Sequence, residues 1–390
     1  MLLLAVLPFP GTVALRLICL AAAFAYAVYA WKRLAVPPLP FKGVIAIWVL
    51  VVLASLFYAV DPAYSLGEIK NELGYTMMAF VAFFAICTDE TRMKWMLLAL
   101  AAGALLLSSA ALLAESPTGG WDHSGRHGGV AAYATYIAAA VPAMVLLVFF
   151  YRDVSIRCLA ALALVLLFAA GLYSTQRIIW PVLFSQVIVA LFFYRKSIGL
   201  DAARMTAVLG ILTIVAAIGI LSVQKTRFDR VDWRIIGSVQ MDSDDRMIFW
   251  PKVTARIMEH PLTGTGFGRG GMNKAYRDIM PSNNKDVWHA HNLVLNYGIS
   301  MGIPGMLVML LLFGALGRQY LQFCRASDRK LKLLGVCGIA LVLGVFARNM
   351  VNDLFLRDGA LLFWALNGSF LGLGLRMMAA EAARKADEHA

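Results

Sequence analysis

Long apolar runs alternate with short polar segments along most of the chain. Each run holds roughly 17–25 residues, enough to cross a hydrocarbon core of about 30 Å as one helix. The pattern therefore predicts an all-α polytopic membrane protein, a bundle of 11–12 transmembrane helices. Eleven of the predicted spans lie near 11–31, 41–59, 74–88, 93–114, 130–150, 158–174, 178–194, 204–222, 300–318, 331–349 and 359–377. The first nine residues, next to Pro8 and Pro10, supply a candidate for a further short or broken span.

One polar segment interrupts this pattern. Residues 223–290 are rich in glycine and carry Asp, Arg, Trp and His side chains. Connections of this length are uncommon and usually functional. The sequence thus predicts the first eight or nine spans in 1–222, one large outward loop domain with short amphipathic helices in 223–290, the last three spans in 291–377 and a cytoplasmic tail in 378–390.

The composition agrees with a membrane protein, because 61% of the 390 residues are hydrophobic and 15% are charged. Soluble domains average about half apolar and about a quarter charged. Lysine and arginine concentrate in alternate short loops, such as 152–157 and 325–332, and in the C-terminal tail. The positive-inside rule assigns these loops to the cytoplasm, and long segments translocate regardless of their charge. The net charge of +12 therefore follows mainly from topology and indicates no nucleic-acid partner.

Ionisable residues are nearly absent from the predicted spans. No Asp or Glu lies deep within any span, and Arg16 is the only basic residue well inside one. Ion-coupled transporters usually keep carboxylates at membrane depth, so the candidate chemistry concentrates on the outward face. The histidines of the outward loops are His123, His127, His260, His289 and His291. Their distribution alone is a weak indication, because loop histidines are often solvated.

The stretch WHAHNLVLNYGISMGIPG, residues 288–305, places titratable groups at the start of an apolar run. Asn292 suits a helix N-cap, so His291 lies just before the first turn, where the helix dipole disfavours the imidazolium. A neutral histidine is what a general base requires. An unbroken helix from Asn292 to Arg318 would be about 40 Å long. Its first turns are therefore expected outside the hydrocarbon core or in a protein-lined cavity.

The same stretch is interrupted where a span is usually most regular. Gly298 and Gly302 form a GxxxG pair that lets a neighbouring helix approach, and Pro304 predicts a kink or break. The alternative interpretation is a capped packing helix with an incidental histidine. A zinc site formed by Asp286 with the two histidines of the stretch lacks a convincing fourth ligand, so we predict no metal.

Two arginines are candidate ligands for a phosphate. Arg246 lies in the first turn of a predicted short helix, capped by Ser243 or Asp244, whose apolar face rests on the membrane or on the bundle. This face comprises Phe249, Trp250, Val253 and Ile257. An arginine is unfavourable at this helix end unless an anion, such as Asp242 or a ligand, compensates it. Arg177 follows a tight outward turn, where it is either a snorkelling side chain or a bidentate phosphate ligand.

The segment GTGFGRGG, residues 264–271, follows the predicted short helix. Its glycine content favours a flexible loop. A phosphate cradle built from its backbone N–H groups is the alternative. The segment lacks, however, the strand–turn–helix setting that gives a glycine motif its meaning, so we interpret it as a flexible loop.

Three motifs together resemble a known family. HNLVLNYGISMGIPG has the form H-N, nine residues, then G-x-x-G, and it resembles the signature of the O-antigen ligase family, within the wider group of bacterial polysaccharide ligases and polymerases. The arginines of TQR, after an apolar span, and of RMIFW, before a tryptophan, resemble the two other marks of the family. Here TQR replaces the commoner Ser–Arg pair. The order of the motifs and the single large loop before the histidine agree as well.

The resemblance implies a fold, a reaction and a set of site residues. The family fold is a helical bundle capped by a periplasmic loop domain, in the inner membrane of Gram-negative bacteria. The reaction transfers glycan from an undecaprenyl-pyrophosphate carrier to a lipid A–core sugar, without a metal or cofactor. By the resemblance, His291 is the catalytic base, and Arg177 and Arg246 bind the pyrophosphate. Asn292, beside the histidine, is a further candidate substrate-binding residue, and attack opposite the leaving group would invert the anomeric centre.

Two other functions remain open at this point. A repeat-unit polymerase of the same group would use the same donor with a growing glycan as acceptor, and the loop sequences do not decide between the two. A lipid-linked glycan transporter belongs to a different class. It predicts basic residues lining a cavity at membrane depth and internal repeat symmetry, neither of which the sequence displays.

Overall fold

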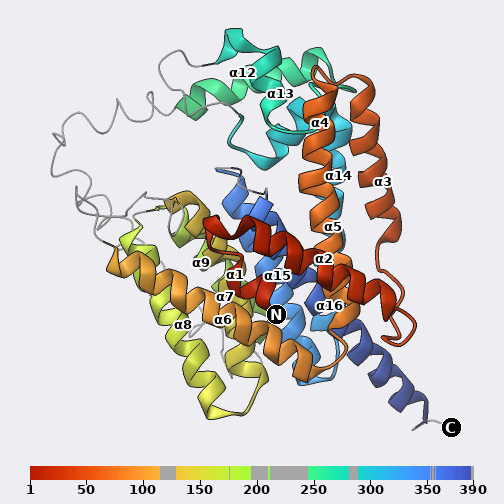
Figure 1. Ribbon diagram of the computed structural model, residues 1–390, viewed down its shortest axis with the longest axis vertical. Helices are drawn as coiled ribbons and strands as arrows, with labels where there is room; N and C mark the ends of the chain where they lie inside the picture. The colour runs from red at the N-terminus through yellow and green to blue at the C-terminus, as the bar shows by residue number, and fades with distance from the viewer. Residues whose placement is uncertain are drawn as a thin grey trace.

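The structure, a computed structural model, describes residues 1–114, 129–174, 176–194, 210, 245–280, 289–351, 353, 355 and 357–387. Helices are the only regular secondary structure of these residues (Figure 1), which confirms the all-α class. The predicted span 204–222, apart from Gly210, and the loop segments 223–244 and 281–288 lie outside the described residues. We call residues 245–280 the loop segment.

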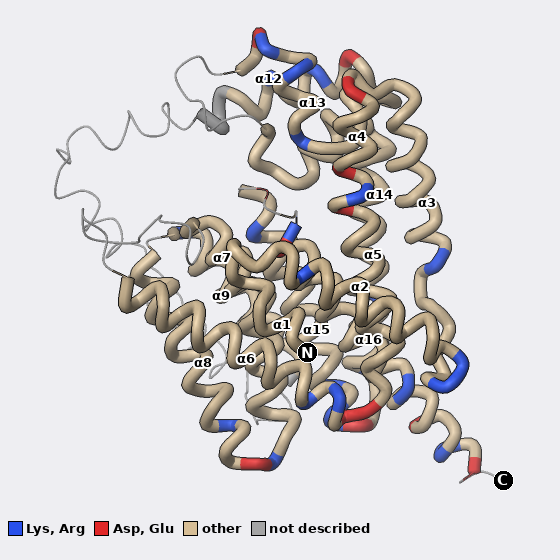
Figure 2. The backbone as a smooth tube through the Cα atoms, in the orientation of Figure 1, with Lys and Arg blue, Asp and Glu red and all other residues tan. Residues whose placement is uncertain are grey.

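Within the described residues, seven helices are long and apolar enough to cross a membrane, and two shorter apolar helices accompany them. This confirms a polytopic membrane protein. The seven are α2 Val13–Tyr29, α6 Glu90–Leu113, α7 Val130–Phe150, α8 Val154–Tyr173, α14 Leu293–Cys324, α15 Arg329–Asn349 and α16 Arg357–Asp387. The shorter two are α3 Lys42–Ala54 and α9 Ile179–Tyr194. Figure 2 shows the charged residues gathered towards the helix ends and the loop segment, with the long helices mostly uncharged in between.

The remaining helices are short. They are α1 Leu2–Val6, η1 Pro10–Thr12, η2 Ser55–Phe57, α4 Pro62–Glu68, η3 Ile69–Gly74, α5 Tyr75–Ile86, α12 Asp245–Glu259, α13 Gly270–Ala275 and η5 Arg277–Ile279. Five residues of α1 span only about 7.5 Å, so α1 does not cross the membrane. It lies against α6, where Gly103 admits the Ala5 carbonyl: a Cβ at Gly103 would lie 2.6 Å from that oxygen.

The bundle core is held by close contact between α16 and α5. A Cβ at Gly368 would lie 2.5 Å from the Phe80 carbonyl, and a Cβ at Gly372 would lie 2.4 Å from the Phe84 carbonyl. These two glycines form a GxxxG pair whose bare backbone lets α5 approach, the usual packing device of membrane helices. Trp364 of the same helix stacks on Trp48 with ring centroids 5.7 Å apart.

One end of the bundle carries the candidate site. At this end, the site end, α7, α9, α14 and α16 begin and α15 ends. The helices α3, α4 and the first part of α14 rise beyond the other helices and lie beside α12 and α13 (Figure 1). α12 buries Phe249, Val253 and Ile257 on one face and packs on α14. The amphipathic helix predicted from the sequence therefore rests on the bundle.

α14 is broken at Gly302, whose backbone has φ +68° and ψ −164°. The break leaves backbone polar groups that need partners in an apolar setting, and the loop segment supplies these partners. The bonds run from Thr265 N–H to Ile299 O (3.0 Å), from Gly266 N–H to Ser300 O (3.0 Å) and from Ile303 N–H to Pro261 O (2.7 Å). A Cβ at Gly302 would lie 2.5 Å from the Pro261 carbonyl. A break is present as predicted, but at Gly302 rather than at Pro304. Of the predicted GxxxG pair, Gly298 meets Ile257 of the helix α12, whereas Gly302 meets a loop.

Candidate active site

His291 lies immediately before α14, next to the N-cap Asn292. Its side chain is half-buried, and its backbone is left-handed with φ +51°. The predicted cap is confirmed, because the Asn292 side chain accepts a hydrogen bond from Leu295 N–H at 3.1 Å. Its Nδ2 donates to Met350 O at 3.0 Å. Asn292 therefore ties the start of α14 to the end of α15 beside His291.

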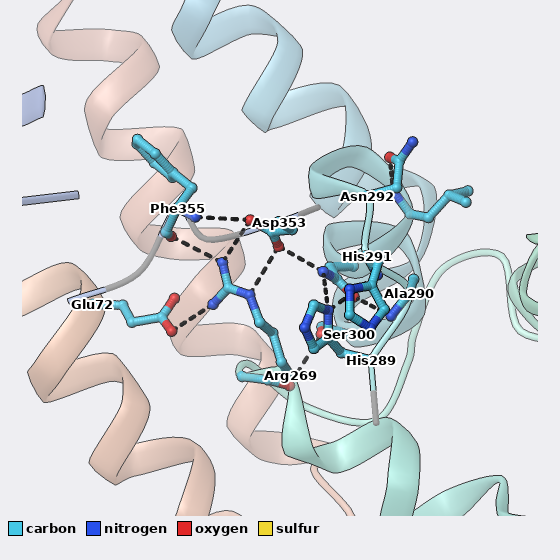
Figure 3. A network of polar contacts seen from close by, with 12 residues as sticks. Glu72, Arg269, His289, Ala290, His291, Asn292, Ser300, Asp353 and Phe355 are labelled. Atoms are coloured by element: carbon cyan, nitrogen blue, oxygen red, sulfur yellow. Dashed lines mark hydrogen bonds and ion pairs between the residues drawn. The ribbon is translucent and has the colours of Figure 1, made fainter. Parts of the chain in front are cut away.

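His289 lies against His291 (Figure 3). The two rings stack with centroids 4.0 Å apart and an interplanar angle of 26°. Nδ1 of His289 accepts the main-chain N–H of His291 at 3.0 Å. The His289 residue is only 2% exposed, and this burial, reinforced by the nearby His291, lowers the pKa of His289 to about 3. His289 is therefore buried and neutral.

Asn296, in the first turn of α14, contacts His289 and Ala290 from their buried side. Its Oδ1 accepts the Ala290 N–H at 2.8 Å. Its Nδ2 donates to Asp353 Oδ2 at 2.6 Å and lies 3.3 Å from Nδ1 of His289. Since Oδ1 faces an N–H donor and Nδ2 faces a carboxylate, the orientation of the amide is determined.

Asp353, the partner of Asn296, belongs to a buried ion cluster with Arg269 and Glu72 (Figure 3). Arg269 of the loop segment, 5% exposed, binds Asp353 through Nε at 2.8 Å and Nη2 at 3.0 Å. Its Nη1 binds Glu72 at 2.6 Å, and Nη2 also donates to Phe355 O at 2.9 Å. Burial alone would raise the pKa of Asp353, but the Arg269 guanidinium holds it below its usual value. The cluster joins the loop segment, the α4–α5 region and the α15–α16 connection under the histidines.

The interpretation of residues 264–271 as a flexible loop is wrong. Residues 265–269 are buried, and their backbone is bonded to three other parts of the bundle. Besides the two bonds to α14, the Phe267 N–H donates to Ser55 Oγ (3.1 Å) and the Gly270 N–H donates to the Tyr64 hydroxyl (2.9 Å). The N–H groups of Thr265, Gly266, Phe267 and Gly270 are thereby occupied and do not serve a phosphate cradle. Gly266 has φ +91° and a Cβ there would lie 2.4 Å from Ala59 Cβ, so glycine is required for docking.

Sequence reasoning missed Arg269, Asp353 and Asn296. A usable signal existed for Asn296, which lies four residues after the N-cap and so shares the face of α14 that the cap occupies. Arg269 and Asp353 gave no local signal, because their significance depends on each other across 84 residues of sequence.

Arg177 lies at the site end, before α9, and is half-buried. The tight turn predicted there is confirmed by the bounds of α8 and α9, although Thr175 lies outside the described residues. The start of α7 is tied to the end of α15 by a bond from Arg348 Nη2 to Ala131 O at 2.8 Å. Tyr133, near the start of α7, donates its hydroxyl to Leu167 O, near the end of α8, at 3.3 Å. The turn from α8 to α9 therefore lies at the site end, so Arg177 and His291 lie at the same end of the bundle.

Arg246 lies in the first turn of α12, as predicted, and its side chain is outside the described part of the structure. Four residues further along the same helix, Trp250 donates its Nε1–H to Ala290 O at 2.7 Å. Residues four apart share a helix face. The face of α12 on which Arg246 is placed therefore meets the main chain next to His291.

The described residues contain no group of three or more His, Cys, Asp or Glu side chains arranged to hold a metal ion. Nδ1 of His289 is occupied by the His291 N–H, and Asp286 lies outside the described residues. Metal independence therefore remains a prediction for experiment.

Residues 162–310 match the family model described as O-antigen ligase. The matched range contains Arg177, Arg246 and His291, which carried the resemblance in the sequence, and also Arg269. No curated protein matches the chain. The match confirms, over residues 162–310, the resemblance to the O-antigen ligase family, which points to a membrane enzyme of the glycosyltransferase type in O-antigen processing.

Proposed function

We propose, from this family match and the geometry around His291, that the protein is an O-antigen ligase that transfers glycan from an undecaprenyl-pyrophosphate carrier to a lipid A–core sugar. The observation that carries the proposal is the position of His291. The motif histidine lies half-buried where the loop segment meets the bundle, on a main chain held by the hydrogen bonds described above. A general base needs access to substrate and a fixed position, and this position supports both.

In the proposed reaction, the acceptor hydroxyl attacks the anomeric carbon of the donor glycan. The new C–O bond forms opposite the pyrophosphate, the bond from the anomeric carbon to the pyrophosphate oxygen breaks, and the configuration is inverted. His291 takes the hydroxyl proton as the bond forms. Undecaprenyl pyrophosphate leaves with the electron pair, and the imidazolium then returns the proton to water. No metal or cofactor takes part in the proposed mechanism.

The two motif arginines are the proposed ligands of the pyrophosphate. Arginine is always protonated and its planar fork binds two phosphate oxygens at once. The position of Arg177 at the site end, and of Arg246 on the α12 face that meets the His291 segment, supports this role.

Asn292 is proposed as a substrate contact next to the base. One N–H of its amide donates to Met350 O and its oxygen accepts from Leu295 N–H. An asparagine amide has a second N–H and a second acceptor lone pair. These remaining groups are suited to a sugar hydroxyl, while the bonds to the backbone keep the side chain in place.

We place the site end at the periplasmic face of the inner membrane of a Gram-negative bacterium. The positive-inside pattern of the short loops supports this orientation. In this arrangement residues 223–290 form a periplasmic loop domain over the site, and residues 378–390 form a cytoplasmic tail into which α16 continues as far as Asp387. The carrier lipid would lie in the membrane with its pyrophosphate at headgroup level.

Deleting the gene in its host tests this function against the polymerase. A ligase mutant accumulates full-length lipid-linked polymer while the lipid A–core remains unextended. A polymerase mutant instead carries cores capped with single repeat units. Complementation with the wild-type gene and with His291→Ala separates loss of this activity from other effects of the deletion: wild type is expected to restore extended core and the variant is not.

A further inference from the structure

We propose that His289 is a positioning residue for His291, which fixes the left-handed backbone of His291 through a hydrogen bond and supports its imidazole through ring stacking. This inference rests on the proposed function, in which His291 is the base. In the HAHN sequence, residues 289–292, the half-buried His291 is the base and the buried His289 holds it in position.

The backbone of His291 needs such support. Its φ of +51° lies in the left-handed region, which a residue with a Cβ adopts at a cost. Such conformations persist where surrounding contacts determine them, and they occur often at functional sites. The contact here is the bond from the His291 N–H to Nδ1 of His289, at 3.0 Å.

This bond defines the tautomer of His289. Because Nδ1 accepts, the ring must be neutral with its proton on Nε2. A protonated His289 would turn a donor towards the His291 N–H and would also place a positive charge against the His291 ring, whose centroid is 4.0 Å away. The Asn296 amide, 3.3 Å from the same Nδ1, adds a second donor that favours the neutral acceptor.

His289 is itself held by a chain of groups that leads to the buried ion cluster. Asn296 binds the Ala290 N–H between the two histidines and is anchored by Asp353. Asp353 is bound in turn by Arg269 of the loop segment. The buried ion cluster thus fixes the position of His289, and His289 fixes the position of His291, the proposed base.

Three substitutions at His289 separate the two contributions. His289→Asn keeps an acceptor near the position of Nδ1 and loses the ring. His289→Phe keeps a stacking ring and loses the Nδ1 acceptor of the His291 N–H. His289→Ala loses both. Each full-length variant is purified in detergent and assayed with undecaprenyl-pyrophosphate-linked glycan and lipid A–core, and kcat and the KM for the donor are measured separately.

We expect kcat to fall roughly ten- to a hundredfold in His289→Phe, the usual effect of losing a hydrogen-bond acceptor, and to fall further in His289→Ala, which also loses the stacked ring. The KM for the donor should stay near the wild-type value, because the arginines are untouched. His289→Asn should retain most of the kcat that His289→Phe loses. If His289 only filled space, His289→Phe would be the more active of the two variants, because Phe fills the space of the ring better than Asn.

Equal loss in His289→Asn and His289→Phe, or wild-type kcat in all three variants, overturns the inference. In either case an inactive His291→Ala leaves the proposed function standing. If His291→Ala retains transfer, the proposed function itself fails, and the two failures are therefore distinguishable. Monodisperse elution of each variant and an unchanged KM show that a fall in kcat is not misfolding.

Discussion

Arg269 and Asp353 are 84 residues apart in the sequence and form a buried two-bond ion pair, with Nε–Oδ2 and Nη2–Oδ1 distances of 2.8 and 3.0 Å. The pair joins the loop segment to the connection between α15 and α16. Because Asp353 also holds Asn296, the docking of the loop segment and the positioning of the histidines depend on the same carboxylate.

Arg269→Ala is expected to destabilise the protein strongly. Removing one partner of a buried pair leaves a buried charge without compensation, which costs about 3–5 kcal/mol. The apparent Tm in detergent should fall sharply. A matched control is Arg256→Ala in the same loop segment, whose ion pairs with Glu259 and Asp278 lie at the surface. A similar fall in Tm for both variants would contradict a special role of the buried pair.

Gly302→Ala should weaken docking of the loop segment on α14. The φ of +68° and the 2.5 Å approach of the Pro261 carbonyl both exclude a Cβ. We expect a lower apparent Tm and increased protease cleavage in the loop segment. Gly314→Ala in the same helix is the control, because a Cβ there meets nothing within 4 Å. Unchanged protease resistance in Gly302→Ala would show that the break is not needed for docking.

The buried His289 predicts a dependence of stability on pH. Its pKa is lowered from 6.5 to about 3 by burial, so between these values the unfolded state binds the extra proton. The contribution of His289 to the free energy of unfolding is therefore present above pH 6.5 and is lost as the pH falls, by about 1.4 kcal/mol per unit. Unfolding at pH 7.5 and 5.5 should show a larger loss in wild type than in His289→Phe. Parallel losses would mean that His289 is protonated in the folded state.

Replacing the motif arginines tests their role in donor binding. Arg177→Ala and Arg246→Ala should each lower transfer about ten- to a hundredfold, because a charge-assisted hydrogen bond is worth roughly 1.5–3 kcal/mol. Lysine should restore the activity only in part, since it keeps the charge and loses the fork. Arg152→Ala, an exposed arginine at the other end of the bundle, is the control. Full activity of both Lys variants would argue against two-point phosphate binding.

Transfer should persist in excess EDTA, because the proposed mechanism uses an imidazole and two guanidinium groups and no metal. The assay compares initial rates of the purified protein with and without chelator. A loss of activity that a divalent ion restores would replace this mechanism with a metal-assisted one.

The features predicted correctly from the sequence are those that depend on local pattern. The apolar runs locate the nine apolar helices found in the described residues, Asn292 caps α14 as its residue type suggests, and the spacing of Phe249, Val253 and Ile257 reveals the buried face of α12. Each requires only neighbours within one or two turns.

The missed features depend on contacts distant in sequence. Taken alone, the sequence GTGFGRGG is typical of a flexible loop. In the fold, Ser55, Tyr64 and the broken α14 lie against this segment and bind its backbone. The ion cluster forms because the fold brings Glu72, which is 197 residues from Arg269, and Asp353 to the same guanidinium. A GxxxG pair indicates close approach but not the partner: Gly302 meets a loop, whereas Gly368 and Gly372 meet α5.

The central claim is that His291 is the base, and the rate of transfer by purified His291→Ala tests it most directly. Wild type and variant are reconstituted with the lipid-linked glycan and lipid A–core, and formation of extended lipid A–core is followed over time. The account predicts that the variant elutes and unfolds like wild type, because the His289 acceptor of the main-chain N–H and the Asn292 cap remain, yet forms no detectable product. Transfer by His291→Ala at a rate close to that of wild type would contradict the account.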